Sequence, residues 1–568
     1  MFRVRSSLAT KRPGIAVACL GVGVILAAAQ DAPLPQTSPA KLRVTTRLVQ
    51  LDVLVTDKQG RPVSGLTKDD FALYENGKPQ TIATFSYTQP QTDAAAPPPL
   101  PPNHYTNRPE YQRPPGPLTM LMLDALNTPA SDQANARRQL LRYLETQLQP
   151  GQGTAIFALG NSLRLLQDFT DDPRLLHAAI QEVAARKPRL TKEDHDRIDL
   201  SMLESHPQMR AAARQLYRLE EEQLRSEADT RVQITLGALR SIARSVGGYP
   251  GRKNLVWISS AFPLTLQPEQ FTTGNLSLES GLANSPRYMK EVRQTAAMLA
   301  YAQVAIYPVD ARGLVAGSND PALGGRPEGY SDTQTELLES HGVMQQLAEE
   351  TGGRAFFNRN DIDRAVALSA ADGTSSYQLG FYPVVSAWDG KFHRLKVHVS
   401  RPDLEVRSRR GYFAEDPLLW RETLEKPDEE MRAALRNPIP ATQVTFVARV
   451  LEQPADSRGH VDIQFAVYAD SLSFEEEAGG LHHAQVDFVA VAFAPDGSVA
   501  AQDSRTSVMH LRPDIFSRLQ KEGVPFQIQL ELAPGSYQLS LGVRDSRTGA
   551  IGTTAVPLEI KSSPKPAR

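Results

Sequence analysis

The chain has 568 residues, of which 41% are hydrophobic and 22% are charged. Two to four folded domains are expected at this length, and the composition excludes a wholly disordered chain. The formal net charge is −2, which gives no electrostatic reason to expect nucleic acid or an anionic membrane surface as a partner.

The first 29 residues have the three parts of a secretory signal peptide. Basic residues come first, positions 14–26 are almost wholly apolar, and three alanines ending at Ala29 provide a cleavage site. The apolar run is shorter than the about 20 residues of a spanning helix. We therefore expect a mature, periplasmic or extracellular chain with no membrane span; an uncleaved anchor is the alternative. Cleavage would also remove Cys19, the only cysteine, which excludes disulfides and thiolate chemistry.

Residues 42–88 are expected to form a small β unit. Apolar side chains alternate with others between Val49 and Val55, which is the period of a strand. Asn76-Gly77 separates two later apolar runs, a pattern that predicts a tight hairpin. Residues 89–117 are rich in proline and predict an extended linker, because such segments favour a stiff, solvated backbone.

The sequence pattern changes at residue 118, and residues 118–415 are expected to form an α/β domain. Short runs that are apolar throughout are typical of strands buried on both faces of a parallel sheet, and four occur here: 118–123, 154–159, 255–259 and 304–309. Helical patterns separate these runs. We therefore expect an open, mostly parallel sheet with helices on both faces. Residues 186–230 are rich in charged side chains and predict a solvated helical insertion.

The remainder of the chain predicts a β-sandwich. Residues 416–440 have the charge and proline content of a linker. In residues 441–562 several short runs alternate apolar and polar side chains, with turns such as Pro534-Gly535 between them. This spacing is typical of an antiparallel sandwich, and we expect an immunoglobulin-like one. His482-His483 precedes a predicted strand and is interpreted as part of a surface loop.

A candidate ligand site follows the first strand of the predicted α/β domain. In open α/β sheets, ligands bind beyond the carboxyl ends of the strands. The run ending at Leu123 is followed by Asp124, Asn127 and Thr128, whose oxygen atoms suit a hard divalent cation such as Mg²⁺. The alternative is a structural role in which Asp124 caps the next helix or binds loop amides.

Four segments, taken in order, resemble a known family. They are VTDKQGRPVSGLTKDDF (55–71), GRKNLVWIS (251–259), AEETGG (348–353) and YQLGFY (377–382). As an ordered set they resemble the VWFA-related proteins that are abundant in acidobacteria and contain a von Willebrand factor type A domain. The resemblance covers roughly residues 44–413, and it implies the type A fold for the central domain.

The type A fold carries a metal-ion-dependent adhesion site, and this sequence matches its pattern in part. The pattern has Asp-x-Ser-x-Ser after the first strand, a Thr in a later loop and an Asp after the fourth strand. Asp124 matches the first Asp and Thr128 the second Ser, whereas Leu126 replaces the first Ser. Thr235 is the candidate for the loop Thr, and serines replace the final Asp. The resemblance implies a degenerate site for Mg²⁺ or another divalent cation, to which Asn127 adds an amide oxygen.

The sequence lacks the common motifs of catalysis, which makes an enzyme the less favoured interpretation. The sequence has no His-Glu-x-x-His, no Gly-x-Ser-x-Gly and no phosphate-binding loop. We expect an exported, non-catalytic protein of the adhesion type that binds a protein or cell-surface ligand through the strand-end face of its type A domain. A metal-free periplasmic scaffold is the alternative, and a hydrolase is less favoured.

Overall fold

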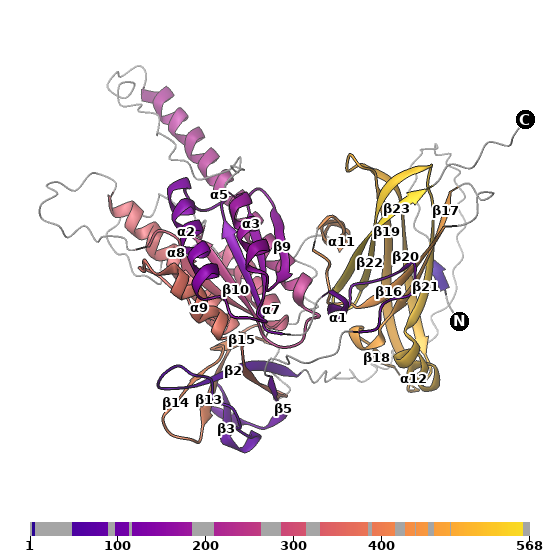
Figure 1. The fold of residues 1–568 in the computed structure, drawn as a ribbon, viewed down its shortest axis with the longest axis horizontal. Helices are drawn as coiled ribbons and strands as arrows, with labels where there is room; N and C mark the ends of the chain where they lie inside the picture. The colour runs from indigo at the N-terminus through magenta and orange to yellow at the C-terminus, as the bar shows by residue number, and fades with distance from the viewer. Residues whose placement is uncertain are drawn as a thin grey trace, which may run out of the picture.

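The protein is described by a computed structural model with three folded bodies (Figure 1). The structure describes residues 3–5, 48–88, 97–112, 116–183, 210–262, 286–313, 330–383, 389–414, 427–437, 439–452, 459–477 and 479–560. Of the predicted signal peptide, only β1 (Arg3–Arg5) lies within these ranges, where it pairs with β20 (Val499–Leu511). Residues 186–209 of the predicted insertion lie outside the described residues.

The first body is a small β domain made from two distant parts of the chain. One sheet has the order β14 (Leu404–Arg407), β2 (Val49–Asp57), β12 (Ser376–Phe381) and β5 (Ile82–Thr88). The other has the order β15 (Gly411–Phe413), β13 (Phe392–Val399), β3 (Phe71–Glu75) and β4 (Lys78–Gln80). Their apolar faces share one core, to which both parts of the chain contribute.

This pairing changes the predicted domain boundaries. Residues 42–88 were expected to form a unit of their own, and residues 376–413 were assigned to the α/β domain. In the structure β12 lies between β2 and β5, so neither part has a complete sheet without the other. The predicted Asn-Gly turn is present between β3 and β4, with positive φ at Asn76 (49°) and Gly77 (79°), as a tight hairpin turn requires.

The central α/β body contains a five-stranded sheet with helices on both faces. The strand order is β11 (Val304–Asp310), β10 (Lys253–Ser259), β7 (Leu118–Asp124), β8 (Gly153–Leu159) and β9 (Leu163–Thr170). The first four strands are parallel and only the edge strand β9 is antiparallel, so the sheet is mixed but mostly parallel, as predicted. Every residue of β7, β8, β10 and β11 is buried.

Two hydrophobic clusters cover the two faces of this sheet. The helices of one face are α2 (Ala130–Thr146), α3 (Pro173–Val183) and α9 (Ile362–Ala371). Those of the other face are α5 (Arg210–Val246), α7 (Pro286–Tyr301) and α8 (Tyr330–Thr351). Part of the predicted insertion is thus the start of α5, a single helix of 37 residues whose later half is a core helix.

The third body consists of two antiparallel sheets that share one core. One sheet has the order β21 (Val524–Glu531), β17 (His460–Val467), β16 (Phe446–Glu452) and β6 (His104–Thr106). The other contains β1, β20, β19 (His482–Phe493), β22 (Gly535–Asp545) and β23 (Ile551–Ile560), with β18 (Glu475–Glu476) beside β19. Phe465 and Phe488 meet across the core with ring centroids 5.4 Å apart. The immunoglobulin-like strand order stays a prediction.

Both predicted linkers contribute to this third body. From the proline-rich segment, β6 extends the first sheet, and the buried amide of Asn107 donates to the carbonyls of Ala441 and Val444. A four-residue helix, α1 (Pro109–Gln112), follows. From the charged segment, α11 (Pro427–Arg436) packs its apolar face on the second sheet. A final helix, α12 (Pro513–Glu522), joins β20 to β21. No helix of the described residues is long and apolar enough to cross a membrane.

Candidate functional site

The strand order places the candidate site at the switch point of the sheet. From β7 the chain builds outward through β8 and β9 on one side, and then returns to add β10 and β11 on the other. At such a reversal the loops leaving two neighbouring strands diverge, and doubly wound sheets bind their ligands in the crevice between them. The carboxyl ends of β7 and β10 carry Asp124 and Ser259, respectively.

Asp124 lies at the centre of a buried hydrogen-bond network. Its Oδ1 accepts the backbone N–H of Asn127 at 3.0 Å, and its Oδ2 accepts the Asn127 amide at 2.9 Å. The indole Nε1–H of Trp257 also donates to Oδ2, at 3.0 Å, and Ser259 Oγ lies 2.9 Å from the same atom. Burial raises the pKa of Asp124, and these hydrogen bonds oppose the rise.

The other three predicted site residues lie in the same network. Thr235 of α5 accepts the Asn127 amide at 2.9 Å and donates to the carbonyl of Arg231 at 2.8 Å. Thr128 Oγ1 accepts the backbone N–H of Ser260 at 3.1 Å. The structure therefore brings Asp124, Asn127, Thr128 and Thr235 together, although they come from two segments more than 100 residues apart in the chain.

The arrangement of these residues does not fit a divalent cation. Three N–H groups direct their positive ends at the Asp124 carboxylate, so a cation at those oxygens would have to displace them. Leu126, at the position of the missing serine ligand, is fully buried in the core. Among the described residues, Asn127 Oδ1 is a buried oxygen without a hydrogen-bond partner. One such oxygen is far short of the near-octahedral shell that Mg²⁺ demands.

A second polar cluster, which the sequence analysis missed, follows the neighbouring strand β11. Arg312 binds both carboxylate oxygens of Asp310 at 2.9 Å, and His341 Nε2 lies 2.9 Å from Asp310 Oδ2. The His341 ring stacks on Phe357. Burial opposes ionisation of Asp310, but the hydrogen bonds from His341 and Arg312 outweigh it and lower its pKa. The sequence signal was present, because an apolar strand ending in Asp is the pattern that drew attention to Asp124.

Helix α5 extends far beyond this strand-end face (Figure 1). It leads into β10 through a short turn, so its start lies beyond the carboxyl ends of the strands. The helix is about 55 Å long at 1.5 Å per residue, and among its side chains that the structure describes the first buried one is Ala228. Before that point, Leu216 and Leu219 are 44% and 55% exposed and lie on one side of the helix.

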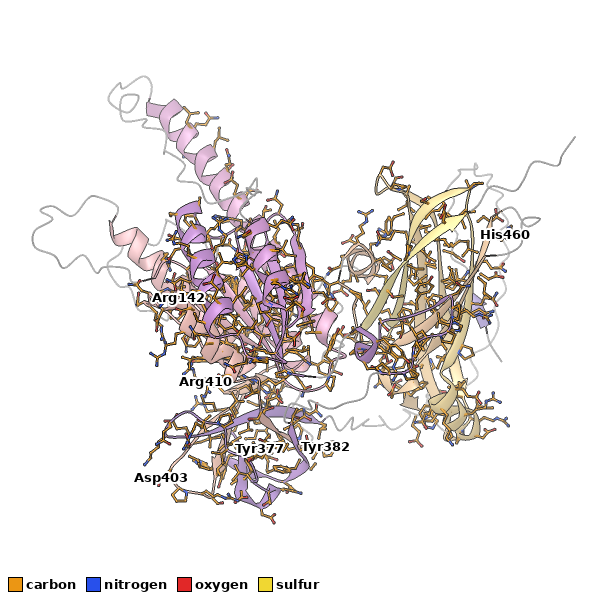
Figure 2. The ribbon with its side chains drawn as sticks, viewed as in Figure 1. Arg142, Tyr377, Tyr382, Asp403, Arg410 and His460 are labelled. Carbon is orange, nitrogen blue, oxygen red and sulfur yellow. The ribbon has the colours of Figure 1, made fainter. Side chains whose placement is uncertain are left out.

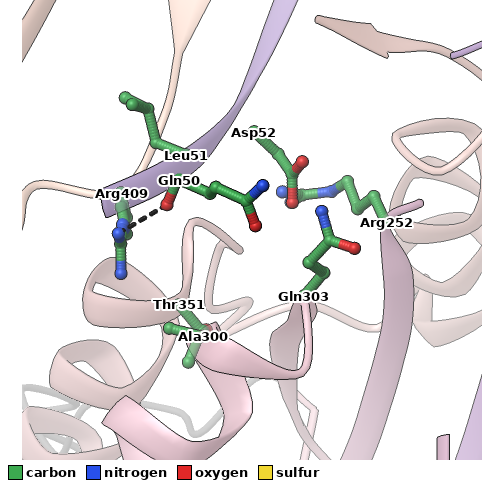
Figure 3. Close-up of a pocket in the computed structure, with 8 residues that line it drawn as sticks. All are labelled: Gln50, Leu51, Asp52, Arg252, Ala300, Gln303, Thr351 and Arg409. Carbon is green, nitrogen blue, oxygen red and sulfur yellow. Dashed lines mark hydrogen bonds between the residues drawn. The ribbon is translucent and has the colours of Figure 1, made fainter. Parts of the chain in front are cut away.

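The opposite end of the sheet holds a second, smaller candidate site. There the α/β domain meets the small β domain around Asp52 and Arg252 (Figure 3). The cavity has a volume of about 10 Å³, which is room for one water molecule. Among the described residues, three buried donors here have no hydrogen-bond partner: Arg252 Nε, Gln303 Nε2 and Arg409 Nε. This size suits a contact between domains rather than an organic ligand.

Hydrogen bonds beside this cavity join the two domains. The backbone N–H of Arg410 donates to the carbonyl of Glu349 at 3.1 Å, and Figure 2 shows Arg410 where the α/β domain meets the small β domain. Arg407 forms an ion pair with Asp372. Within the small β domain, Arg409 donates to the carbonyl of Gln50 at 2.6 Å, and burial lowers its pKa to about 10.

Because Lys253 is buried at this junction, we expect the stability of the folded protein to depend on pH. Its side chain is 0% exposed and donates to the carbonyl of Tyr249 at 2.7 Å, and burial lowers its pKa to about 7 from 10.5. Between these values the unfolded chain binds more protons than the folded one, so the free energy of unfolding rises with pH, by up to about 1.4 kcal/mol per pH unit. Lys253→Met should remove this slope.

Urea unfolding between about pH 7.5 and 9.5 measures that slope. Lys396→Met is the control, because Lys396 of β13 is exposed and should leave the slope unchanged. Equal slopes in Lys253→Met and the parent chain would show that Lys253 is charged in the folded protein over this range.

Comparisons with solved structures find distant likenesses. No protein-family model and no curated protein matches the chain. An aerotolerance-related membrane protein from Bacteroides fragilis is 14% identical, with a TM-score of 0.24, over 45% of this chain and 98% of its own. The protein BatB from Bacteroides thetaiotaomicron is 13% identical, with a TM-score of 0.23, over 45% and 97%.

A third solved structure spans more of the chain. The ArnB paralog VWA2 from Sulfolobus acidocaldarius is 8% identical, with a TM-score of 0.21, over 87% of this chain and 76% of its own. Sequence identities and TM-scores this low do not assign the chain to a family. The description of the central domain as a doubly wound α/β domain rests on its own strand order and register.

Proposed function

We propose that this chain is an exported, non-catalytic binding protein that holds a protein partner at the strand-end face of its α/β domain, without a divalent cation. The observation that carries the proposal is helix α5, which projects past that face with Leu216 and Leu219 exposed. Exposed leucines one turn apart on a helix are the anchors that a partner with an apolar groove takes up. Export is supported by the N-terminal sequence pattern alone.

The network around Asp124 supports a structural role for the switch point. Its carboxylate is 2% exposed and accepts donors on both oxygens, so it presents no free charge to a ligand. The hydrogen bond from the Asn127 amide to Thr235 links the loop after β7 to α5. The proposed role of these residues is therefore to hold the binding helix, and not to ligate metal.

A catalytic role is less well supported by the same geometry. A general acid or base needs a lone pair or proton within reach of a substrate. Asp124 has both oxygens engaged, and Asp310 is held by Arg312 in a two-point ion pair. Both carboxylates are 3% exposed or less.

Site-specific crosslinking in the native host tests the proposal. A photoreactive amino acid at position 219 should give one dominant protein adduct, and a chelator should not reduce it. Tyr301 is the matched control, because it is 79% exposed at the end of α7, near the amino ends of the strands and so at the opposite end of the sheet from the strand-end face. Loss of the adduct with chelator would restore the metal-dependent adhesion hypothesis, and equal adducts from both positions would contradict a site on α5.

A further inference from the structure

Two histidines and a glutamate converge on the second sheet of the third body, the one that contains β19 and β20. His483 of β19 and His510 of β20 are direct cross-strand partners, so their side chains leave the same face of the sheet. Glu477 follows β18, whose Glu475 pairs with His483. His482-His483 was interpreted as a loop from the sequence; the structure places it at the start of β19 instead.

The loop after β18 directs Glu477 toward the histidine pair. Two backbone hydrogen bonds hold this loop: Glu477 N donates to the Leu481 carbonyl at 2.7 Å, and Gly480 N donates to the Glu477 carbonyl at 3.1 Å. Glu477 Oε2 then lies 2.9 Å from His510 Nδ1. The two imidazole rings have centroids 4.7 Å apart.

The three side chains form a group with the spacing of a metal site. One ligand atom from each lies within 4.8 Å of the others, and among the described residues no other set of three His, Cys, Asp or Glu side chains meets this condition. Tetrahedral Zn²⁺ with bonds of about 2.1 Å needs ligand atoms about 3.4 Å apart. The group must therefore contract by up to about 1.4 Å at its widest, and His510, at 51% exposure, has the freedom to rotate inward.

We propose that Glu477, His483 and His510 bind a Zn²⁺ ion, with three protein ligands and a fourth position open to solvent. Imidazole nitrogens favour borderline transition metals, and a carboxylate completes a ligand set that Zn²⁺ accepts. Mg²⁺ and Ca²⁺ prefer oxygen ligands and are excluded by the two histidines. The site lies in a different body from the strand-end face, so it does not depend on the proposed function.

Bound metal would tie three segments of the sheet edge together. The ligands come from the loop after β18 and from the paired strands β19 and β20. Two of the three positions are fixed by strand register, which gives the site a rigid base. The open fourth position would face solvent, where a carboxylate or imidazole of another protein could complete the tetrahedron.

The test is calorimetric titration of the full chain, without a histidine tag, with Zn²⁺. One equivalent is expected to bind, and His483→Ala, His510→Ala and Glu477→Gln should each weaken binding at least about tenfold. His460→Ala is the matched control. His460 lies on the same body (Figure 2). Its Nε2 is 3.3 Å from Glu531 Oε1, and it is not part of the group. This variant should bind Zn²⁺ as the parent chain does.

Co²⁺ provides a second readout that reports geometry. The parent chain should develop the visible absorption of tetrahedral cobalt, and His483→Ala/His510→Ala should lose it while keeping the parent's far-UV circular dichroism. Zn²⁺ binding that is equal in the parent and this double variant would overturn the proposal. An equal loss of affinity in His460→Ala would also overturn it, because the metal would then be held elsewhere.

Discussion

Replacing Asp124 with alanine is expected to lower the free energy of unfolding by about 4 kcal/mol, because three buried N–H donors lose their acceptor. The donors belong to Asn127 and Trp257, which are 1% and 0% exposed, so bulk solvent does not reach them. Each unsatisfied donor costs about 1–3 kcal/mol. Urea unfolding of the variant and the parent chain measures the difference.

Ser259→Ala is the matched control for Asp124→Ala. It removes the hydroxyl 2.9 Å from Oδ2 but leaves the carboxylate with its N–H donors, so the expected loss is about 1 kcal/mol. A loss below about 1 kcal/mol in Asp124→Ala would contradict the structural role. Stabilisation of the parent chain by Mg²⁺ that disappears in Asp124→Ala would favour the metal hypothesis instead.

Gly353→Ala is expected to cost several kcal/mol, because its Cβ would lie 1.8 Å from the carbonyl oxygen of Ile306. Gly353 follows the left-handed Gly352 at the end of α8, and its N–H donates to the carbonyl of Ala348. The atoms in the way are all backbone atoms of Ile306 in β11, so they cannot rotate away as a side chain would. Thermal unfolding should show a large fall in Tm, or no folded protein.

Gly342→Ala is the matched control, and it is expected to raise the stability of the protein instead of lowering it. Gly342 lies inside α8, and nothing stands within 4 Å of the position its Cβ would take. Alanine there should stabilise the protein by up to about 1 kcal/mol, because alanine loses less conformational freedom in a helix. If Gly353→Ala were as stable as the parent chain, the close approach of β11 to the end of α8 would be wrong.

The parts of the fold that follow from local sequence were predictable. Strands β7, β8, β10 and β11 are buried on both faces, and that burial leaves continuous apolar runs in the sequence. The pairing of β12 with β2 was not predictable, since Tyr377 lies opposite Val53 across more than 300 residues and periodicity reveals a strand but not its neighbour. For the same reason β6 was taken for linker.

The candidate site was predictable in its residues but not in its chemistry. Asp124 and Asn127 were identified because they follow a buried strand. What distinguishes a ligand from a structural carboxylate is the direction of the surrounding donors, and that depends on strand register. Trp257 is fully buried in the core, and the alignment of β10 with β7 aims its N–H at Asp124. His483 and His510 become neighbours only through the register of β19 and β20.

The discontinuous small β domain has a consequence for biosynthesis. Strands β2 and β5 leave the ribosome before β12, which must fit between them. The intervening stretch, from Thr88 to Ser376, takes about 15–60 s to translate at the usual rates. During that delay two apolar strands expose unpaired edges, which favours aggregation and recruitment of a chaperone. A nascent chain stalled before Ser376 should therefore remain bound to chaperones, and release should follow the emergence of β12.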